Sequence, residues 1–266
     1  MKFGFIGCGN MGGALALAVS KSLPACEIAV CDAFAQKAED FAKANGVCLS
    51  NAKEIAGKCK YVFLGVKPQS FENLFAEIAP VLQKRTDGFV LVSMAAGLSI
   101  SAVEKMAACD PKVIRIMPNT PVSVGAGVIL YSVNAKVNEN EVAEFCKALS
   151  ATGVVDPIPE DKIDAASALS GCGPAFVALF AEALADGAVE CGLPRDKAAL
   201  YAAQTILGTA QLILESGKHP GQIKDAVCSP GGTTIEGVHA LEKGKFRASS
   251  MNAVTAAYEK TLKLKK

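Results

Sequence analysis

The first half of the chain alternates short apolar runs with segments whose apolar residues recur every three or four positions. Short runs rich in β-branched and aromatic residues predict strands, and the longer spacing predicts amphipathic helices. Strands are predicted over residues 2–6, 27–31, 60–66, 88–93, 112–117 and 127–131, and helices over 10–20, 33–44, 68–79 and 99–108. This alternating order predicts a mainly parallel, doubly wound sheet with helices on both faces.

The second half has a different pattern. After about residue 137 the alternation ends, and Ala-rich helical patterns follow over residues 140–149, 174–191, 194–215, 219–228, 233–243 and 246–263. We therefore expect an α/β domain over residues 1–157 and an all-helical domain over residues 158–266. These helices are apolar over wide faces, and such helices usually pack against another subunit. The second domain is thus predicted to form a homodimer or a larger homo-oligomer.

Composition narrows the classes of partner. The 266 residues are 51% hydrophobic and 20% charged, which is enough apolar material for a sizeable core. Lys and Arg number 27 against 26 Asp and Glu, so a formal net charge of +1 favours neither nucleic acid nor an acidic membrane as a partner. Ten scattered cysteines without a CxxC pair favour reduced thiols. Because no apolar run reaches about 18 residues, we expect a cytoplasmic protein.

A glycine-rich motif follows the first predicted strand and opens the first predicted helix, and it consists of Gly7, Cys8, Gly9, Asn10, Met11 and Gly12. In this context a GxGxxG motif is typical of the dinucleotide site of a Rossmann domain. Gly7 permits the tight turn, Gly9 lets a pyrophosphate approach the backbone, and Gly12 allows close helix packing. The helix N-terminus presents free amides and a positive dipole to the phosphates.

Asp32 ends the second predicted strand, about twenty residues after Gly12. An acidic side chain at this place accepts hydrogen bonds from the adenine ribose and repels a 2′-phosphate, which favours NAD. Gln36 and Lys37 lie one helical turn further along and are candidates for contacting a phosphate, so both NADH and NADPH stay open. Asp32 as a helix cap and Lys37 on a solvated face are the structural alternatives.

Three further segments fall just beyond predicted strand ends, the edge at which open α/β sheets bind ligands. They contain Val66, Lys67 and Pro68; Ala95, Ala96 and Gly97; and Pro118 and Asn119. The small residues of the second segment would let a nicotinamide lie close to the backbone. Asn119 stands between two prolines and is predicted to contact cofactor and substrate, with a purely structural turn as the alternative.

The second half contains two Gly-rich segments that lead into helices, over residues 169–175 and 228–234. The later segment predicts a nest for a carboxylate. Its donors would be the hydroxyls of Ser229 and Thr233 and the backbone amides of Gly231, Gly232, Thr233 and Thr234. Such a nest uses fixed dipoles in place of a Lys or Arg. A simple capping loop is the alternative.

Metal and nucleophilic chemistry find little support. The histidines, His219 and His239, lack a ligand-spaced partner, so no metal site is expected. Cys8 and Cys172 have no neighbouring base, and packing is their expected role.

Taken in order, these motifs closely resemble those of pyrroline-5-carboxylate reductases over nearly the whole chain. The segments 219–225, 229–236 and 243–247 are particularly specific to that family. The resemblance implies reduction of 1-pyrroline-5-carboxylate to L-proline with NADPH or NADH, the last step of proline biosynthesis. It also implies that the helical C-terminal domains intertwine as a dimer, and that Ser229 to Thr234 hold the substrate carboxylate.

The chemistry fits a site with few ionisable groups, because a cyclic imine is readily protonated near neutrality and then accepts hydride. Our hypothesis is that Thr234 is the catalytic residue and hydrogen-bonds the ring nitrogen. A β-hydroxyacid dehydrogenase or an imine reductase is the first alternative. That dehydrogenase class resembles a chemistry that uses a lysine on the first interdomain helix, but here the stretch between Lys162 and Lys197 contains no lysine. A dinucleotide-binding protein without turnover is the second.

Overall fold

The computed structural model describes residues 1–264. By its contacts the chain divides into two compact units. The first unit contains residues 1–171 and the C-terminal segment that begins at Tyr258, and the second unit contains Cys172–Ala257. The predicted boundary after residue 157 coincides with the end of the last strand, and as a domain boundary it stays a prediction. Residues 265–266 of the predicted second domain lie outside the described residues.

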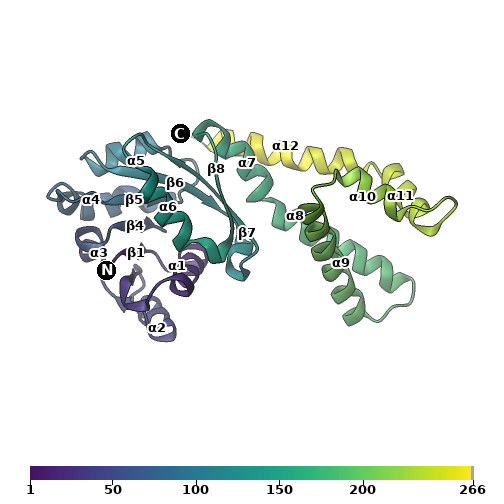
Figure 1. Ribbon diagram of the computed structural model, residues 1–266, viewed down its shortest axis with the longest axis horizontal. Helices are drawn as coiled ribbons and strands as arrows, with labels where there is room; N and C mark the ends of the chain where they lie inside the picture. Colours follow the sequence, from purple (N-terminus) through teal and green to yellow (C-terminus); the bar gives the residue numbers. More distant parts are fainter. Residues whose placement is uncertain (265–266) are drawn as a thin grey trace. The chain divides into compact units, whose positions relative to one another are not determined.

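One sheet of eight strands forms the centre of the described part of the first unit (Figure 1). Its order is β3-β2-β1-β4-β5-β6-β7-β8, and only the β6–β7 pair is antiparallel. The strands are β1 (Phe3–Ile6), β2 (Ile28–Cys31), β3 (Cys48–Leu49), β4 (Tyr61–Leu64), β5 (Val90–Ser93), β6 (Lys112–Pro118), β7 (Gly127–Val133) and β8 (Gly153–Pro157). The six predicted strands and the mainly parallel topology are confirmed, while β3 and β8 were not predicted.

The helices of the first unit cover both faces of the sheet. They are α1 (Asn10–Ser22), α2 (Ala35–Asn45), α3 (Ala52–Lys58), α4 (Phe71–Leu82), α5 (Ile100–Ala107), α6 (Glu139–Ala148) and α7 (Ile163–Ser170). Ser99 caps α5, since its Oγ accepts from the amide of Ala102 at 3.2 Å. The predicted helix at Pro68 begins as a 3₁₀ turn, Pro68–Ser70, before α4. The short helices α3 and α7 were not predicted.

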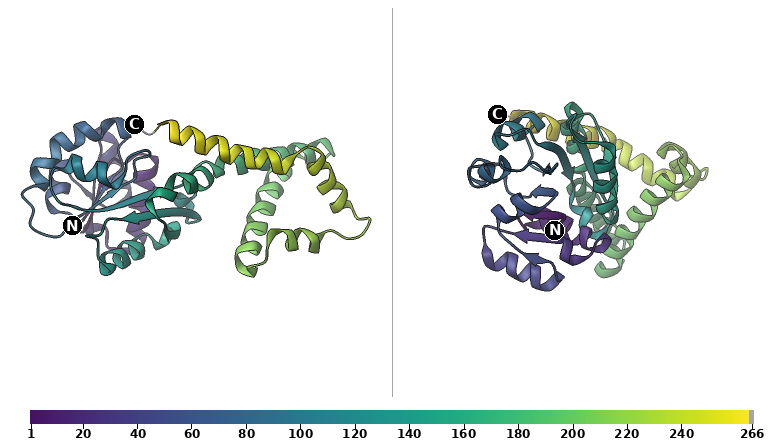
Figure 2. Two further views of the ribbon diagram at one scale, coloured as in Figure 1. Left: turned by 90° about the horizontal axis from the view of Figure 1, so that it is seen from above. Right: turned by 60° about the vertical axis from the view of Figure 1, so that its left-hand side comes forward.

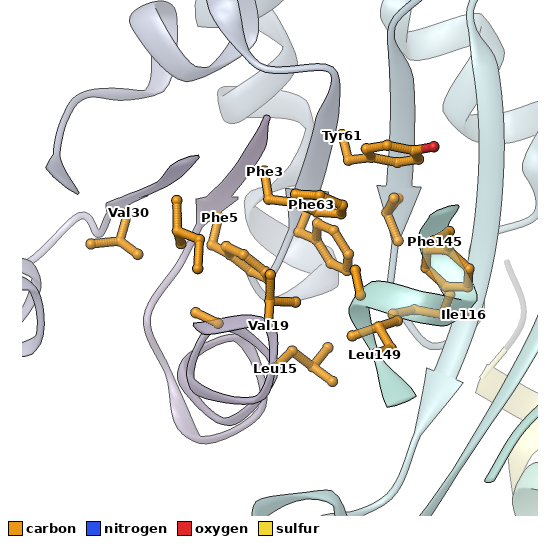
Figure 3. Close-up of a cluster of buried hydrophobic side chains, with 14 of the residues drawn as sticks. Phe3, Phe5, Leu15, Val19, Val30, Tyr61, Phe63, Ile116, Phe145 and Leu149 are labelled. Carbon is orange, nitrogen blue, oxygen red and sulfur yellow. The ribbon is translucent and has the colours of Figure 1, made fainter. Parts of the chain in front are cut away.

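Alternating side chains along the strands supply two separate cores. Phe3 and Phe5 point to the face covered by α1 and α6, where Phe63 and Phe145 join them (Figure 3). Ile6 points to the opposite face, which α3, α4 and α5 cover. A fully buried side chain of this size contributes about 1.5–3 kcal/mol, so burial on both faces fixes the strand register.

A buried ionic cluster fastens α7 to this sheet. The Arg115 side chain, on β6, is 4% exposed, and its guanidinium lies 3.1 Å from carboxylate oxygens of both Glu160 and Asp164. Glu160 also accepts from the amide of Ile100 at 2.7 Å, at the start of α5. The cluster therefore holds the first residues of α5 and α7 against strand β6.

The second unit is helical, with α8 (Gly173–Glu190), α9 (Arg195–Ser216), α10 (Pro220–Val227), α11 (Thr233–Lys243) and α12 (Phe246–Leu264), the last of which continues beyond Ala257. Helices α8 and α9 follow one another along the chain (Figure 2) and pack together around a small cluster of Ala185, Ala198 and Ala202. Many of its larger apolar side chains are exposed. Within the described residues, the stretch 160–190 is long and apolar enough to cross a membrane by length and composition alone, a test that a core helix of a soluble protein also passes.

Candidate active site

Four predicted loops meet at one edge of the sheet. Strands β1, β4, β5 and β6 are parallel neighbours, so their carboxyl ends lie on the same side. Gly7 to Gly12 follow β1, Val66 to Pro68 follow β4, Ala95 to Gly97 follow β5, and Pro118 and Asn119 end β6. The strand order reverses direction between β1 and β4, which is where open α/β sheets bind dinucleotides.

The glycine loop combines a tight packing contact with an open backbone. A Cβ on Gly12 would lie 2.1 Å from the carbonyl oxygen of Gly7, so α1 approaches β1 closely only without a side chain there. At Gly9 a Cβ would meet nothing within 4 Å. Gly9 is also the N-cap of α1, and no side chain caps that helix. The first turn of α1 thus has the open, positively polarised end that a pyrophosphate requires.

A cavity of about 570 Å³ adjoins this loop. Its walls include Gly7, Asp32 and Val66, as the sequence led us to expect, and also a group that the sequence analysis missed: Ser50, Asn51, Asn73 and Glu77. Ser50 and Asn51 follow β3, which has only two residues and therefore gave no strand signal. A recognised strand there would have placed its loop at the same edge.

Asp32 links the ends of two strands. Its Oδ2 accepts a hydrogen bond from the amide of Cys8 at 2.7 Å, and its Oδ1 accepts from the amide of Phe34 at 3.0 Å. Helix α2 begins at Ala35 with Phe34 as its N-cap, so Asp32 is not the cap of that helix. Each oxygen has a second lone pair, which leaves the carboxylate able to accept from a ribose hydroxyl.

The thiol of Cys8 is unsuited to nucleophilic chemistry. Burial, together with the charge of Asp32, raises the pKa of Cys8 to about 11, so the thiol stays protonated at neutral pH. Its Sγ donates to the carbonyl of Cys31 at 3.4 Å. This environment agrees with the expected packing role.

Asn119 makes two contacts inside the first unit. Its Oδ1 accepts from the amide of Val128 at 2.8 Å, and its Nδ2 donates to the carbonyl of Ser170, the last residue of α7, at 3.0 Å. The side chain is therefore held rigidly, with one amide hydrogen left over. Its predicted contacts with cofactor and substrate stay a prediction.

The second Gly-rich segment forms a tight turn in the second unit. The amide of Gly232 donates to the carbonyl of Ser229 at 3.0 Å, and Gly231 has a φ of +65°, which favours glycine. Helix α11 then begins at Thr233 with no capping side chain. Ser229 and Thr233 are exposed and Thr234 is half-buried. The first-turn amides therefore have the character of the predicted nest, whose ligand stays a prediction.

His219 has a structural role. Its Nδ1 accepts from the amide of Gly221 at 3.1 Å and caps α10. Cys172, in the earlier Gly-rich segment, is the N-cap residue of α8 without a side-chain capping bond.

Comparison with known proteins gives two matching family models. The model described as pyrroline-5-carboxylate reductase dimerisation matches residues 160–264, and the model described as NADP oxidoreductase, coenzyme F420-dependent, matches residues 2–97. Pyrroline-5-carboxylate reductase 3 of Danio rerio is 43% identical, with 99% of this chain and 91% of that protein covered. The Escherichia coli reductase is 39% identical, with 100% and 98% covered.

Solved structures agree along the whole chain. A pyrroline-5-carboxylate reductase from Coxiella burnetii has a TM-score of 0.92 at 31% identity, and the comparison covers 100% of this chain and 98% of that one. A Plasmodium falciparum pyrroline carboxylate reductase with NADP bound has a TM-score of 0.85 at 32% identity, with the same coverage. These full-length similarities, together with the glycine loop and the turn before α11, show that this chain belongs to the pyrroline-5-carboxylate reductase family.

Proposed function

We propose that this chain reduces 1-pyrroline-5-carboxylate to L-proline with a reduced nicotinamide dinucleotide, the last step of proline biosynthesis. One observation carries the proposal: over its full length the chain matches reductases of this name, and it keeps both an open glycine loop and a turn with exposed helix amides. This combination supplies a dinucleotide site and a carboxylate site without a metal or a nucleophile.

The residues of the first unit fit the dinucleotide. Gly9 leaves room at the uncapped end of α1 for the pyrophosphate, and Asp32 presents its carboxylate to the adenine ribose. The loops Val66 to Pro68 and Ala95 to Gly97 lie further along the same edge and would hold the nicotinamide half. When bound, the cofactor supplies the hydride for the carbon of the C=N bond.

The chain's own contribution on the substrate side is positioning. The amides at Gly232 to Thr234 and the hydroxyls of Ser229 and Thr233 would fix the carboxylate through fixed dipoles. The hydroxyl of Thr234 would accept the N–H of the protonated ring and so orient the iminium carbon. Because that ring carries its proton near neutrality, no strong protein acid is required, and orientation can supply most of the rate acceleration.

We further propose that the working unit is a homodimer located in the cytoplasm. The dimer is supported by the matched dimerisation family and by the exposed apolar faces of α8 and α9. The location is supported by the ten free cysteines, a composition typical of a reducing compartment.

The test is the loss of reduced-nicotinamide absorbance when 1-pyrroline-5-carboxylate is added, with a 3-oxoacid as the control substrate. Turnover of the imine alone is expected. Turnover of the 3-oxoacid alone would support a β-hydroxyacid dehydrogenase, and cofactor binding without turnover of either would support a non-catalytic protein.

Thr234→Ala tests the catalytic residue. Removing one positioned hydrogen bond at a reacting centre costs roughly a hundred-fold in rate, so kcat/KM is expected to fall by about that factor. Thr234→Ser keeps the hydroxyl and is the matched control, with most of the activity expected to return. Full turnover by Thr234→Ala would remove Thr234 from the mechanism.

A further inference from the structure

The cavity beside the glycine loop is acidic. Asp32, Glu39 and Glu77 contribute three carboxylates to its walls, and among the lining residues in the described part of the chain there is no Lys, Arg or His. A 2′-phosphate would add a dianion to this cavity without a cation to meet it, whereas a 2′-hydroxyl can donate to a carboxylate.

The carboxylate of Asp32 is held in place by two backbone amides. The amides of Cys8 and Phe34 hold one oxygen each, at 2.7 Å and 3.0 Å. Rotation away from an incoming phosphate would break both bonds. The first of them joins Asp32 to the glycine loop, so the side chain that would contact the ribose is tied to the loop that would bind the pyrophosphate.

Several polar side chains near Asp32 already have hydrogen-bond partners. The Oγ of Ser50 donates to the carboxylate of Glu54 at 3.1 Å, and the Oδ1 of Asn51 caps α3. Gln36 donates to Asp40 at 3.0 Å on the exposed side of α2. Lys37 is exposed and does not line the cavity. Among the described lining residues, neutral and acidic side chains therefore stand where a 2′-phosphate would require a cation.

We propose that this chain prefers NADH to NADPH and that Asp32 is the residue that sets the preference. The inference rests on the proposed function for its role in turnover, but it concerns binding of the nucleotide alone. It also sets this chain apart from the Plasmodium falciparum relative, whose structure holds NADP.

The experiment measures dissociation constants of NADH and NADPH for the full-length protein by calorimetry, without substrate. Adenosine 5′-monophosphate and adenosine 2′,5′-bisphosphate serve as smaller probes that differ only at the 2′ position. NADH and the monophosphate are each expected to bind at least ten-fold more tightly than their 2′-phosphorylated counterparts.

Two variants locate the cause. Asp32→Asn removes the charge and keeps one acceptor for the backbone amides. It is expected to reduce the ratio of the NADPH dissociation constant to the NADH dissociation constant at least ten-fold. Ala33→Arg adds a cation at the next, exposed position and is expected to strengthen NADPH binding at least ten-fold, even if Asp32→Asn folds poorly. Asp110→Asn, which removes an exposed carboxylate of the first unit outside the cavity, is the matched control, with an unchanged ratio of the two dissociation constants expected.

The outcomes are separable. NADPH binding as tightly as NADH, or an unchanged ratio in Asp32→Asn, would overturn the proposed preference and leave the reductase function intact. Failure of both dinucleotides to bind would instead overturn the proposed function.

Discussion

The two units of this chain bury their apolar residues in opposite ways. The first unit encloses large side chains such as Phe3, Phe5 and Tyr61, which are 0% exposed. In the second unit the buried cluster is made of alanines, while Leu179, Leu207 and Leu214 are more than half exposed. Alanines alone bury little area, so the first unit has a core sufficient for its own stability and the second requires a covering surface.

The same contrast holds for charge. The Arg115 guanidinium in the first unit is buried against Glu160 and Asp164, whereas the Asp186–Arg195 pair of the second unit is 60% exposed at both side chains. A second copy of the chain, which the matched dimerisation family implies, would cover apolar faces and leave such pairs in solvent. Four variants test how far this comparison holds.

The largest effect is expected from Leu207→Asp in α9. Leu207 is 55% exposed in the single chain, and a charge there would be desolvated if the face is covered by a second copy. We expect loss of the dimer and unfolding of the second unit, measured as a single-chain mass by light scattering and a loss of helical circular dichroism.

Val154→Asp is the matched control, because Val154 on β8 is also 55% exposed but belongs to the first unit. Its mass and helicity are expected to stay unchanged. A dimer that persists in Leu207→Asp would show that this part of α9 faces solvent and would weaken the contrast between the units.

The second effect concerns Arg115→Met. Removing one partner of a buried ion pair usually costs about 3–5 kcal/mol, because the remaining charge loses its compensation. The free energy of unfolding in urea should fall by this amount, followed by circular dichroism because the chain has no Trp. Adding Asp164→Leu should restore part of the loss, and a single variant as stable as the wild type would contradict the structural role of the cluster.

The sequence predicted the parts of the first unit that rest on periodicity. Six strands and the helices between them appear where the apolar spacing placed them, because burial on both faces requires continuous apolar runs. Strand β3 has two residues and α3 has seven, which is too short for a period to be recognised. Helix α7, of eight residues, was also not predicted, since its packing on the sheet depends on Arg115, a residue distant in sequence.

The candidate site was predictable to a similar degree. The glycine loop and Asp32 have a fixed order along the chain, so sequence alone brought them together. The hydrogen bond from Cys8 to Asp32 and the two contacts of Asn119 join residues far apart in sequence, and no local pattern encodes them. The role of Thr234, which we inferred from the Gly-rich segment and the family resemblance, needs the experiment above.

The third effect depends on pH and on Glu144 in α6. Burial opposes its ionisation, but hydrogen bonds from Lys2, Lys60 and Tyr61 outweigh burial and lower the pKa of Glu144 from 4.5 to about 2. A depressed pKa stabilises the folded state above pH 4.5, and this stabilisation is lost as the pH falls from 4.5 toward 2. After a discount for the partly exposed lysines, it amounts to about 2 kcal/mol.

Urea unfolding of the wild type and Glu144→Gln between neutral pH and pH 2 measures this contribution. The variant should be less stable at neutral pH, and the two proteins should converge as the pH falls. Glu139→Gln is the matched control, because Glu139 is exposed on the same helix. A constant difference at all pH values would show that the loss comes from packing and not from ionisation.

The smallest effect is expected from Asp186→Asn in α8. Ion pairs between exposed side chains contribute less than about 1 kcal/mol and are screened by salt. Unfolding in urea should therefore shift by less than about 0.5 kcal/mol, and high salt should remove the shift. A larger loss that persists in high salt would mean that the second copy desolvates Asp186 and Arg195. In that case the covered surface of the second unit would include charged residues as well as apolar ones. The ion pairs of both units would then be buried, and they would differ only in whether the same chain or a second copy covers them.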